Sequence, residues 1–403
     1  MPNSIVIVGA GQAGGWVAKT LRDKGYEGAL TLIGDEPHHP YERPPLSKAV
    51  LAGEAEDHSV HLFNQGIFAD QNIDFRPNQT VDSIDRDRGV VKLDGEELAY
   101  DKLVLATGGR PRDLPFLSHI SDRLHTLRDL ADARDLRQTL QAGGHLTIIG
   151  GGWIGLEVAA TARKLGCKVT VIEAAPRLCA RAASEPLSAF LLDLHLANGV
   201  TVHLNAGVEA INEQDGKLIC RLSDGQTFET DAVLVGIGIV PNSELAEEAG
   251  LKVENGIMVD ANGQTDDPSI YAVGDVAHRF STLDDQHRRL ESWANAQNEG
   301  IAVAHALLGL DRPPEDIPWF WSDQHGCNIQ ILGIPPEDSE SVFREGGPGQ
   351  TCFYLEGERL VGVHACDDPM AIKVAKRLMT RDLPVDAAKL ADPAISLKSL
   401  LKS

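Results

Sequence analysis

The chain has 403 residues, of which 42% are hydrophobic and 24% are charged, and its formal net charge at pH 7 is −22. One ordinary core does not organise a chain of this length, so two or three domains are expected. The negative charge disfavours nucleic-acid binding, because a polyanion is repelled over long range. No apolar run reaches the ~20 residues that a membrane helix needs, and no basic segment precedes the apolar start, which predicts a cytoplasmic protein without a signal peptide.

The first predicted element is a short apolar strand, residues 4–8, followed by the glycine loop Gly9-Ala10-Gly11-Gln12-Ala13-Gly14. The same succession returns at residues 146–149, which lead into Gly150-Gly151-Gly152-Trp153-Ile154-Gly155. Each copy has a strand, G-x-G-x-x-G, a helix-like segment and a second strand, which predicts two βαβ units and two bound dinucleotides. The first glycine makes a tight turn, the second admits a pyrophosphate, and the third lets helix and strand pack closely.

A carboxylate is expected at the end of the second strand of each unit, where it would bind ribose hydroxyls. In the first unit Asp35 is favoured over Glu36, and in the second unit Glu173 occupies this position. Glu173 predicts a preference for NADH over NADPH, because it accepts the 2′-hydroxyl and repels a 2′-phosphate. Arg177, four residues on, would soften that preference. The alternative for Glu173 is a solvated loop acid.

Two more segments distinguish the units. Residues 103–111 contain a buried strand and the turn Ala106-Thr107-Gly108, and residues 269–275 end in Gly274-Asp275. The second pattern suits a flavin, because Asp275 can accept a hydrogen bond from the ribityl chain while Gly274 permits close approach.

Six scattered cysteines, none in a C-x-x-C or C-x4-C spacing, favour neither a zinc site nor a disulfide framework. We therefore expect no metal and interpret the cysteines as small buried hydrophobes.

Taken together, residues 9–14, 106–108 and 271–275 resemble the two-nucleotide flavoprotein disulfide-reductase superfamily, whose FAD domain is interrupted by an NAD domain. Residues 40–48, Pro-Tyr-Glu-Arg-Pro-Pro-Leu-Ser-Lys, stand where disulfide reductases carry their cysteine pair. With residues 291–296, 318–324 and 395–400, this resembles the NADH-dependent ferredoxin reductases of bacterial ring-hydroxylating dioxygenases and some cytochrome P450 systems. The reductase components of arylpropionate and biphenyl dioxygenases look most similar. The family often has tyrosine where this chain has Trp153, which should alter nicotinamide packing and not the chemistry.

The resemblance implies site residues, carried over onto matching motifs. For FAD these are Gly9, Gly11, Ala13, Gly14, Asp35, Arg43, Lys48, Val81, Ala106, Thr107, Gly108, Arg128, Gly274, Asp275 and Trp293. For NAD they are Gly150, Gly152, Ile154, Gly155, Glu157 and Glu173.

Lys48 and Glu157 are the implied catalytic residues. Lys48 would stabilise negative charge on the reduced flavin, with Arg43 as a second cation. Glu157, which is placed near nicotinamide and flavin and paired with Lys48, has the alternative of being only a helix-dipole acid. Solvated loop charges are the alternative for Arg43 and Lys48.

The resulting prediction is an α/β protein with two Rossmann-like dinucleotide-binding domains and a small α+β C-terminal domain. FAD is assigned to residues 1–110 and 236–318, NAD to 111–235, and the C-terminal cap to 319–403. NADH passes hydride to FAD, which supplies single electrons to a [2Fe–2S] ferredoxin and, through it, a terminal oxygenase. An NADH oxidase or peroxidase and a flavin redox sensor are the alternatives, and a monomer or weak homodimer is expected.

For the ferredoxin, two candidate docking features stand out. His287-Arg288-Arg289 is a basic run in an acidic chain, and it is either solvated surface or a local positive patch. Trp319 and Trp321 share a face if their segment is extended, and they either anchor the cap or border the flavin.

Overall fold

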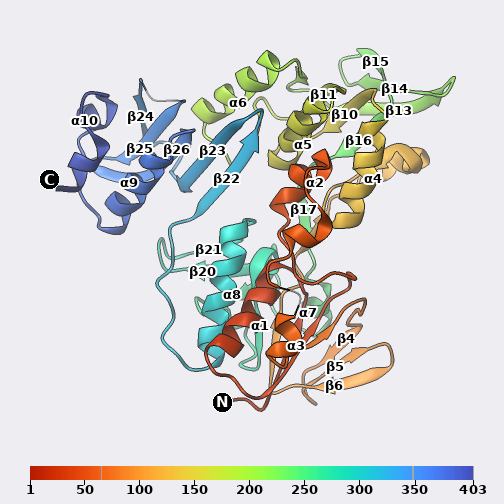
Figure 1. The fold of residues 1–403 in the computed structure, drawn as a ribbon, viewed down its shortest axis with the longest axis vertical. Helices are drawn as coiled ribbons and strands as arrows, with labels where there is room; N and C mark the ends of the chain where they lie inside the picture. The colour runs from red at the N-terminus through yellow and green to blue at the C-terminus, as the bar shows by residue number, and fades with distance from the viewer. Residues whose placement is uncertain (65, 347–348, 403) are drawn as a thin grey trace. The chain divides into compact units, whose positions relative to one another are not determined.

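The computed structural model describes residues 1–64, 66–346 and 349–402, in two compact units (Figure 1). Unit 1 comprises residues 1–43, 57–110 and 239–316, and unit 2 comprises residues 44–56, 111–238 and 317–403. Residues 44–56 and the C-terminal segment thus group with the predicted NAD residues. The three domains expected from the sequence, with boundaries near residues 110, 235 and 318, remain a prediction.

Unit 1 is built on a parallel sheet in the order β19-β7-β1-β2-β3. These strands are β1 (Ser4–Val8), β2 (Ala29–Ile33), β3 (Asp74–Arg76), β7 (Lys102–Leu105) and β19 (Ile270–Ala272). Runs such as Ile5–Val8 and Leu103–Leu105 are buried throughout, as expected for a parallel sheet covered on both faces.

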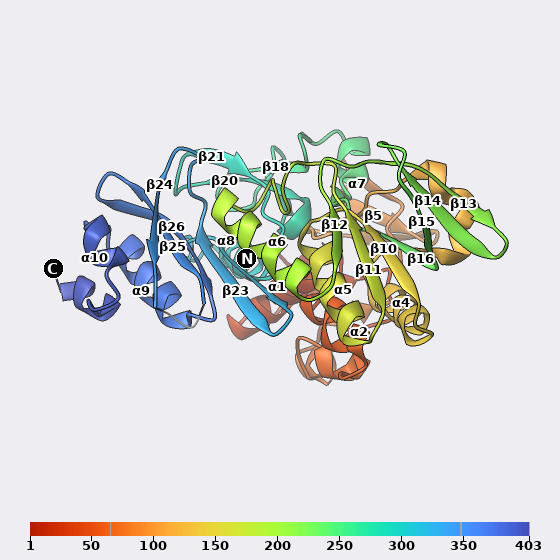
Figure 2. The ribbon, with the colours of Figure 1, turned by 90° about the horizontal axis from the view of Figure 1, so that it is seen from above.

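Helices α1 (Gln12–Asp23) and α8 (Trp293–Leu307) lie side by side and share one core with β1 and β7 (Figures 1 and 2). Their close approach needs Gly300, since a Cβ there would lie 2.8 Å from the carbonyl oxygen of Ala13. The rest of unit 1 consists of β4 (Ser83–Asp85), β5 (Val90–Leu93), β6 (Glu96–Ala99), β8 (Gly109–Pro111), β17 (Ile239–Pro241), β18 (Ile257–Val259), β20 (Ala277–Ser281), β21 (Gln286–Arg288), α3 (Ile67–Asp70), α7 (Glu244–Glu248), and the 3-10 helices η2 (Asp57–Val60) and η4 (Gly274–Val276).

Unit 2 repeats the plan with the parallel sheet β12-β11-β10-β16-β9. Its strands are β9 (Leu124–His125), β10 (His145–Ile149), β11 (Lys168–Ile172), β12 (Thr201–His203) and β16 (Ala232–Val235). Around them are α2 (Ala49–Ala52), α4 (Leu130–Gln141), α5 (Trp153–Lys164), α6 (Glu185–Ala197), the antiparallel strands β13 (Val208–Gln214), β14 (Lys217–Leu222) and β15 (Thr227–Thr230), and the 3-10 helices η1 (Pro44–Ser47) and η3 (Pro115–Arg123).

The C-terminal part of unit 2 is an antiparallel sheet in the order β22-β23-β26-β25-β24. It comprises β22 (Trp319–Gln324), β23 (Cys327–Gly333), β24 (Glu340–Arg344), β25 (Thr351–Glu356) and β26 (Arg359–Cys366). Helix α9 (Pro369–Thr380) packs on β26 and β23, followed by α10 (Ala387–Ala391) and η5 (Leu397–Lys402) (Figure 2). The predicted fold class, α/β with an α+β C-terminal part, is confirmed.

Candidate functional site

The first glycine loop joins β1 to α1 and divides its work among three glycines. A Cβ on Gly9 would lie 2.1 Å from the carbonyl oxygen of Ala106, and one on Gly14 would lie 2.0 Å from that of Gly9. A Cβ on Gly11 would meet nothing within 4 Å. Gly9 and Gly14 are therefore required by close packing within the turn. Beside Gly11, the N-cap of α1, there is space in which a phosphate could accept hydrogen bonds from the helix N–H groups.

The second loop, between β10 and α5, has the same division. A Cβ on Gly150 would lie 2.4 Å from the carbonyl oxygen of Gly236, and one on Gly155 would lie 2.3 Å from that of Gly150. At Gly152, the N-cap of α5, the nearest such neighbour is 3.9 Å away. Each unit therefore holds a cradle of the shape that a dinucleotide pyrophosphate needs.

Glu173 follows β11 and lies against the second loop. Its Oε2 accepts the Gly151 N–H at 2.7 Å, and its Oε1 accepts the Ala175 N–H at 2.7 Å. Arg177 donates instead to the carbonyl oxygens of Ala180 and Ala183 and to the Ser188 hydroxyl. The Arg177 guanidinium is therefore held by residues 180–188, and the role of Glu173 toward a ribose stays a prediction.

The two candidate acids of the first unit have different surroundings. Glu36 accepts from the Tyr41 hydroxyl at 2.5 Å and pairs with Arg43 Nη2 at 2.7 Å. Asp35 is exposed, and among the described residues it makes no hydrogen bond. Asp35 therefore has the freer carboxylate, and its role as the ribose acceptor remains a prediction.

Two turns of unit 1 are fixed by contacts within that unit. Thr107 donates its hydroxyl to the Asn242 carbonyl oxygen at 2.6 Å, and the Asn242 side chain returns a bond to the Thr107 carbonyl oxygen at 3.0 Å. Gly274 has φ +78°, and its N–H donates to Glu299 Oε2 at 2.8 Å. A Cβ on Gly274 would lie 2.8 Å from the Ala13 Cβ, so the Gly274–Asp275 turn and the first glycine loop are adjacent.

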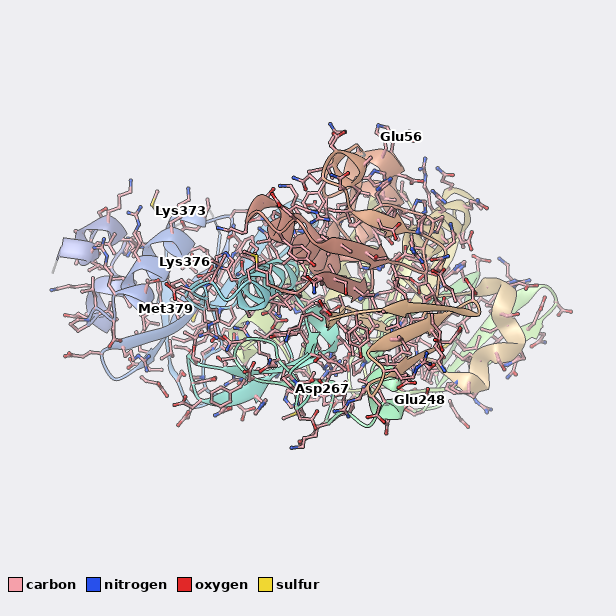
Figure 3. The ribbon with its side chains drawn as sticks, turned by 90° about the horizontal axis from the view of Figure 1, so that it is seen from below. Glu56, Glu248, Asp267, Lys373, Lys376 and Met379 are labelled. Carbon is pink, nitrogen blue, oxygen red and sulfur yellow. The ribbon has the colours of Figure 1, made fainter. Side chains whose placement is uncertain are left out.

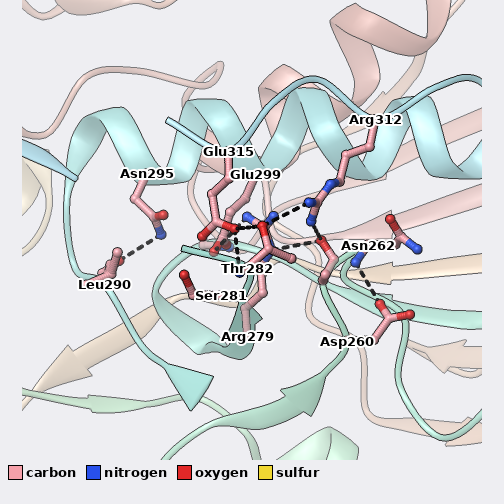
Figure 4. Close-up of polar contacts among 12 residues, drawn as sticks. Asp260, Asn262, Arg279, Ser281, Thr282, Leu290, Asn295, Glu299, Arg312 and Glu315 are labelled. Carbon is pink, nitrogen blue, oxygen red and sulfur yellow. Dashed lines mark hydrogen bonds and ion pairs between the residues drawn. The ribbon is translucent and has the colours of Figure 1, made fainter. Parts of the chain in front are cut away.

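Glu299 was not predicted from the sequence, although it is the buried acid behind this turn. It lies on α8, is 4% exposed, and has Arg279 Nη1 3.7 Å from its Oε1 (Figure 4). Burial raises the pKa of Glu299 to about 7, because Arg279 and the Gly274 N–H only partly offset the desolvation. An acid within the apolar helical segment 296–307 was the one signal that could have identified it.

The predicted pairing of Lys48 with Glu157 is confirmed within unit 2. Lys48 Nζ lies 2.7 Å from Glu157 Oε2, and the side chain of Glu157 is only 4% exposed. Two serines that were not predicted also bind the Glu157 carboxylate: the Ser47 hydroxyl donates to Oε2 at 2.5 Å and the Ser322 hydroxyl donates to Oε1 at 2.6 Å. Thr161 of α5 donates to the Ser47 carbonyl oxygen at 2.7 Å and ties residues 44–56 to this helix.

The predicted site residues divide between the units. Those of unit 1 are Gly9, Gly11, Ala13, Gly14, Asp35, Arg43, Val81, Ala106, Thr107, Gly108, Gly274, Asp275 and Trp293. Those of unit 2 are Lys48, Arg128, Gly150, Gly152, Ile154, Gly155, Glu157 and Glu173. Their roles toward the nucleotides remain predictions.

Aromatic rings gather along β22. The rings of Trp319 and Trp321 are stacked with centroids 5.1 Å apart, which confirms that the two side chains share a face. The ring of Phe320, between them in sequence, lies 4.9 Å from that of Trp153 at the start of α5.

For residues 287–289 the sequence left two alternatives, solvated surface or a local positive patch, and the structure shows that both arginines pair with acids. Arg288 Nε lies 2.5 Å from Asp284 Oδ2, and Arg289 Nη1 lies 2.5 Å from Glu291 Oε1. The Arg289 side chain is only 9% exposed, and it also donates to Asn255. Neighbouring acids thus pair with both arginines, which the local sequence allowed, since Asp284 and Glu291 are close by.

Of the six cysteines, five are buried and Cys327 is half-buried. In the part of the chain that the structure describes, no group of three or more metal-ligating side chains comes together. None of the cysteines lies in residues 44–56, beside the Lys48–Glu157 pair.

Two parallel sheets, each with a glycine loop that leaves space at the N-terminus of a helix, are the architecture of a protein that binds two dinucleotides. The chain belongs to the family described as pyridine nucleotide-disulphide oxidoreductase, which residues 3–300 match, and residues 319–401 match the family described as reductase C-terminal. Its cofactors are FAD and NADH.

The chain is similar over its whole length to reductases of electron-transfer systems. It is 41% identical to putidaredoxin reductase of Pseudomonas putida, over 99% of this chain and 97% of that protein. It is also 41% identical to the ferredoxin–NAD(+) reductase component of the p-cumate 2,3-dioxygenase system of the same species, over 98% of both chains. Among solved structures, the covalent putidaredoxin reductase–putidaredoxin complex matches with a TM-score of 0.95 and 40% identity, over 99% of this chain and 98% of that one.

Proposed function

We propose that this protein is an NADH:ferredoxin oxidoreductase that supplies a [2Fe–2S] ferredoxin and, through it, an aromatic-ring dioxygenase. Similarity of about 40% over essentially the whole length to a ferredoxin–NAD(+) reductase component of a dioxygenase system carries this proposal. A reductase that serves a cytochrome P450 is the alternative.

The two cradles support a separate role for each unit. Gly11 and the Gly274–Asp275 turn are assigned to FAD, and Gly152 and Glu173 to NADH. Bound FAD supplies the chemistry that side chains lack, since it accepts a hydride from NADH and gives up electrons singly. The protein contributes positioning and electrostatics: Asp275 binds ribityl hydroxyls, and Glu173 holds the ribose diol.

Lys48 and Glu157 are assigned to the reacting rings. Lys48 provides a cation for negative charge that develops in hydride transfer, and Glu157 fixes that cation, because its carboxylate pairs with Lys48 Nζ at 2.7 Å. With Glu157 almost fully buried, the pair has little competition from water. Trp153 is assigned to packing against the nicotinamide.

A disulfide substrate fits the site poorly. Thiol–disulfide exchange needs a thiolate beside the cofactor, and residues 40–56 contain no cysteine. The sulfur atoms elsewhere are mostly buried, and burial raises the pKa of the Cys220 thiol to about 11, which disfavours its reactive form.

For ferredoxin docking, α9 is a better basic surface than residues 287–289. Lys373, Arg377 and Lys398 are exposed, and within the described residues none of them forms an ion pair. With Met370 and Val374 they line a hollow of about 220 Å³. Lys373 and Lys376 lie along this helix in Figure 3. We assign the steering of an acidic ferredoxin to this face, since complementary charge speeds association.

None of the helices in the described residues combines the length and apolar character that crossing a membrane requires. We propose a cytoplasmic location, where NADH is available.

Comparison of electron acceptors tests the proposal. The FAD-loaded protein should oxidise NADH with a [2Fe–2S] ferredoxin at a kcat/KM about a hundredfold or more above that with oxygen or glutathione disulfide. Equal turnover with oxygen would favour an NADH oxidase, and slow reduction with a long-lived reduced-flavin–NAD complex would favour a redox sensor.

A further inference from the structure

A chain of buried polar side chains leads from Glu157 into the interior of unit 2. Ser322 Oγ donates to Glu157 Oε1 at 2.6 Å, and Gln324 Nε2 donates to Ser322 Oγ at 2.9 Å. On the other side of this amide, Gln324 Oε1 lies 2.8 Å from His195 Nε2. His325 Nε2 lies 3.2 Å from His195 Nδ1 and completes the chain. The three middle members, Ser322, Gln324 and His195, are at most 1% exposed.

The donors in this chain all point toward Glu157. An amide oxygen only accepts, so His195 must carry a hydrogen on Nε2. In the neutral ring Nδ1 is then an acceptor, which the Nε2–H of His325 can satisfy. The amide nitrogen of Gln324 donates to the Ser322 hydroxyl oxygen, so the hydroxyl hydrogen of Ser322 is available to donate to Glu157. Hydrogen bonds in such a directed chain polarise one another and strengthen.

Both histidines are held in the neutral form that this direction requires. Burial lowers the pKa of His195, against a smaller opposing effect of its bond to Gln324. Burial, His195 and Arg163 lower the pKa of His325 to about 4. Besides the two histidines, the titratable groups that face this hydrogen-bond chain are Lys48, Glu157 and Cys179 at one end and Arg163 at the other.

We infer that His195 is a positioning residue, which acts through Gln324 and Ser322 to fix the Glu157 carboxylate and so hold Lys48 in place. The inference rests on the proposed role of Lys48 in hydride transfer. If His195 did not donate, the Gln324 amide could turn over, and its oxygen would take the Ser322 hydrogen away from Glu157. Oε1 of a buried carboxylate would then lose its donor, and the carboxylate would be free to turn away from Lys48.

This series of hydrogen bonds orients the Glu157 carboxylate and does not conduct protons. Passage of a proton through Gln324 would require its amide to become an imidic acid, whereas orientation requires only the hydrogen bonds that are present. Loss of one orienting hydrogen bond is worth about 1 to 1.4 kcal/mol, or roughly a fivefold to tenfold change in rate.

The first measurement examines His195 directly, with or without flavin. Histidine labelled with ¹⁵N in the imidazole ring should show His195 at pH 7 as the neutral tautomer with hydrogen on Nε2. The Nδ1–H tautomer, or a doubly protonated ring, would overturn the inference whatever the enzyme reduces.

The second measurement is anaerobic stopped-flow reduction of the bound flavin by NADH. His195→Phe keeps a ring but removes the donor, and it should lower the limiting rate about tenfold while the NADH dissociation constant stays within about twofold. His195→Gln can donate again and should restore most of the rate. Gln324→Met, which keeps a side chain of similar length but cannot donate to Ser322, should be as slow as His195→Phe.

The matched control is His364→Phe in the same unit. His364 is also buried, at 1% exposure, and bonds to the Tyr354 hydroxyl at 2.7 Å, but it belongs to none of the contacts around Glu157. It should leave the limiting rate unchanged. Equal rates for His195→Phe and His364→Phe, or no recovery with His195→Gln, would overturn the positioning role. Failure of the proposed function would appear separately, as a protein whose flavin NADH reduces normally but whose electrons do not reach ferredoxin.

Discussion

Glu299 should make the stability of the protein fall as the pH rises through neutrality. Its pKa in the folded protein is about 7, against an ordinary value of 4.5. The folded protein therefore keeps a proton that the unfolded chain releases between these values, so the contribution is complete below pH 4.5 and is lost as the pH rises through 7. At about 1.4 kcal/mol per pH unit, this interval corresponds to about 3 kcal/mol.

Glu299→Gln removes the charge and keeps an oxygen for the Gly274 N–H, which Glu299 Oε2 accepts at 2.8 Å. The variant should match the parent near pH 5 and be more stable by up to about 3 kcal/mol at pH 8. Arg279 keeps Glu315 as a neighbouring acid (Figure 4). Urea unfolding from pH 5 to pH 8.5 at a fixed concentration of free FAD measures the difference, since bound cofactor itself stabilises the folded state.

Glu315→Gln is the matched control of opposite sign. Burial alone would raise the pKa of Glu315, but the backbone N–H and hydroxyl of Thr282 donate to its carboxylate and hold this pKa below its ordinary value. Its contribution is present above the ordinary pKa and is lost as the pH falls, so this variant should be less stable than the parent at pH 8. A Glu299→Gln protein that loses stability toward pH 8 in parallel with the parent would refute the reasoning.

Three further predictions concern the nucleotides and the partner. Gly11→Ala should fold normally, because its Cβ meets nothing within 4 Å, but it should bind FAD at least about tenfold more weakly in a fluorescence titration, whereas Gly14→Ala should lower the folding stability itself. Tight FAD binding by Gly11→Ala would mean that the FAD pyrophosphate does not bind at Gly11. Glu173→Gln should reduce the kcat/KM preference for NADH over NADPH by about tenfold or more, and a parent enzyme that prefers NADPH would contradict this. The double variant Lys373→Glu with Arg377→Glu should slow ferredoxin reduction and flatten its salt dependence, while flavin reduction by NADH stays normal. Arg288→Glu should change the rate of ferredoxin reduction little, because Arg288 is already paired with Asp284. A larger effect of Arg288→Glu than of the double variant would place the ferredoxin-binding surface at residues 287–289.

The sequence was sufficient to predict the fold because its signals are local. The G-x-G-x-x-G loops require specific backbone geometry, and the structure shows the expected packing at Gly9, Gly14, Gly150 and Gly155. The Lys48–Glu157 pair, in contrast, joins residues far apart in sequence, and only the family resemblance pointed to it.

The remaining parts of the site depend on long-range packing. Ser322 and His195 lie on different elements, β22 and α6, and neither has a local pattern that marks a partner of Glu157. Glu299 is one acid in an apolar helix, and its elevated pKa comes from burial that only the tertiary fold produces. The pairing of Arg288 with Asp284 and of Arg289 with Glu291 is, in contrast, local in sequence, and only the structure shows that these contacts form.

The central claim is that electrons from NADH leave this protein one at a time to an iron–sulfur protein. The most direct test mixes catalytic amounts of the FAD-loaded protein with NADH and a [2Fe–2S] ferredoxin, without oxygen, and follows the visible spectrum. The account predicts that two ferredoxins are reduced for each NADH oxidised, because a hydride carries two electrons and the cluster accepts one. A ferredoxin that stays oxidised while NADH reduces the bound flavin, and NADH consumption that resumes only when oxygen is admitted, would contradict it.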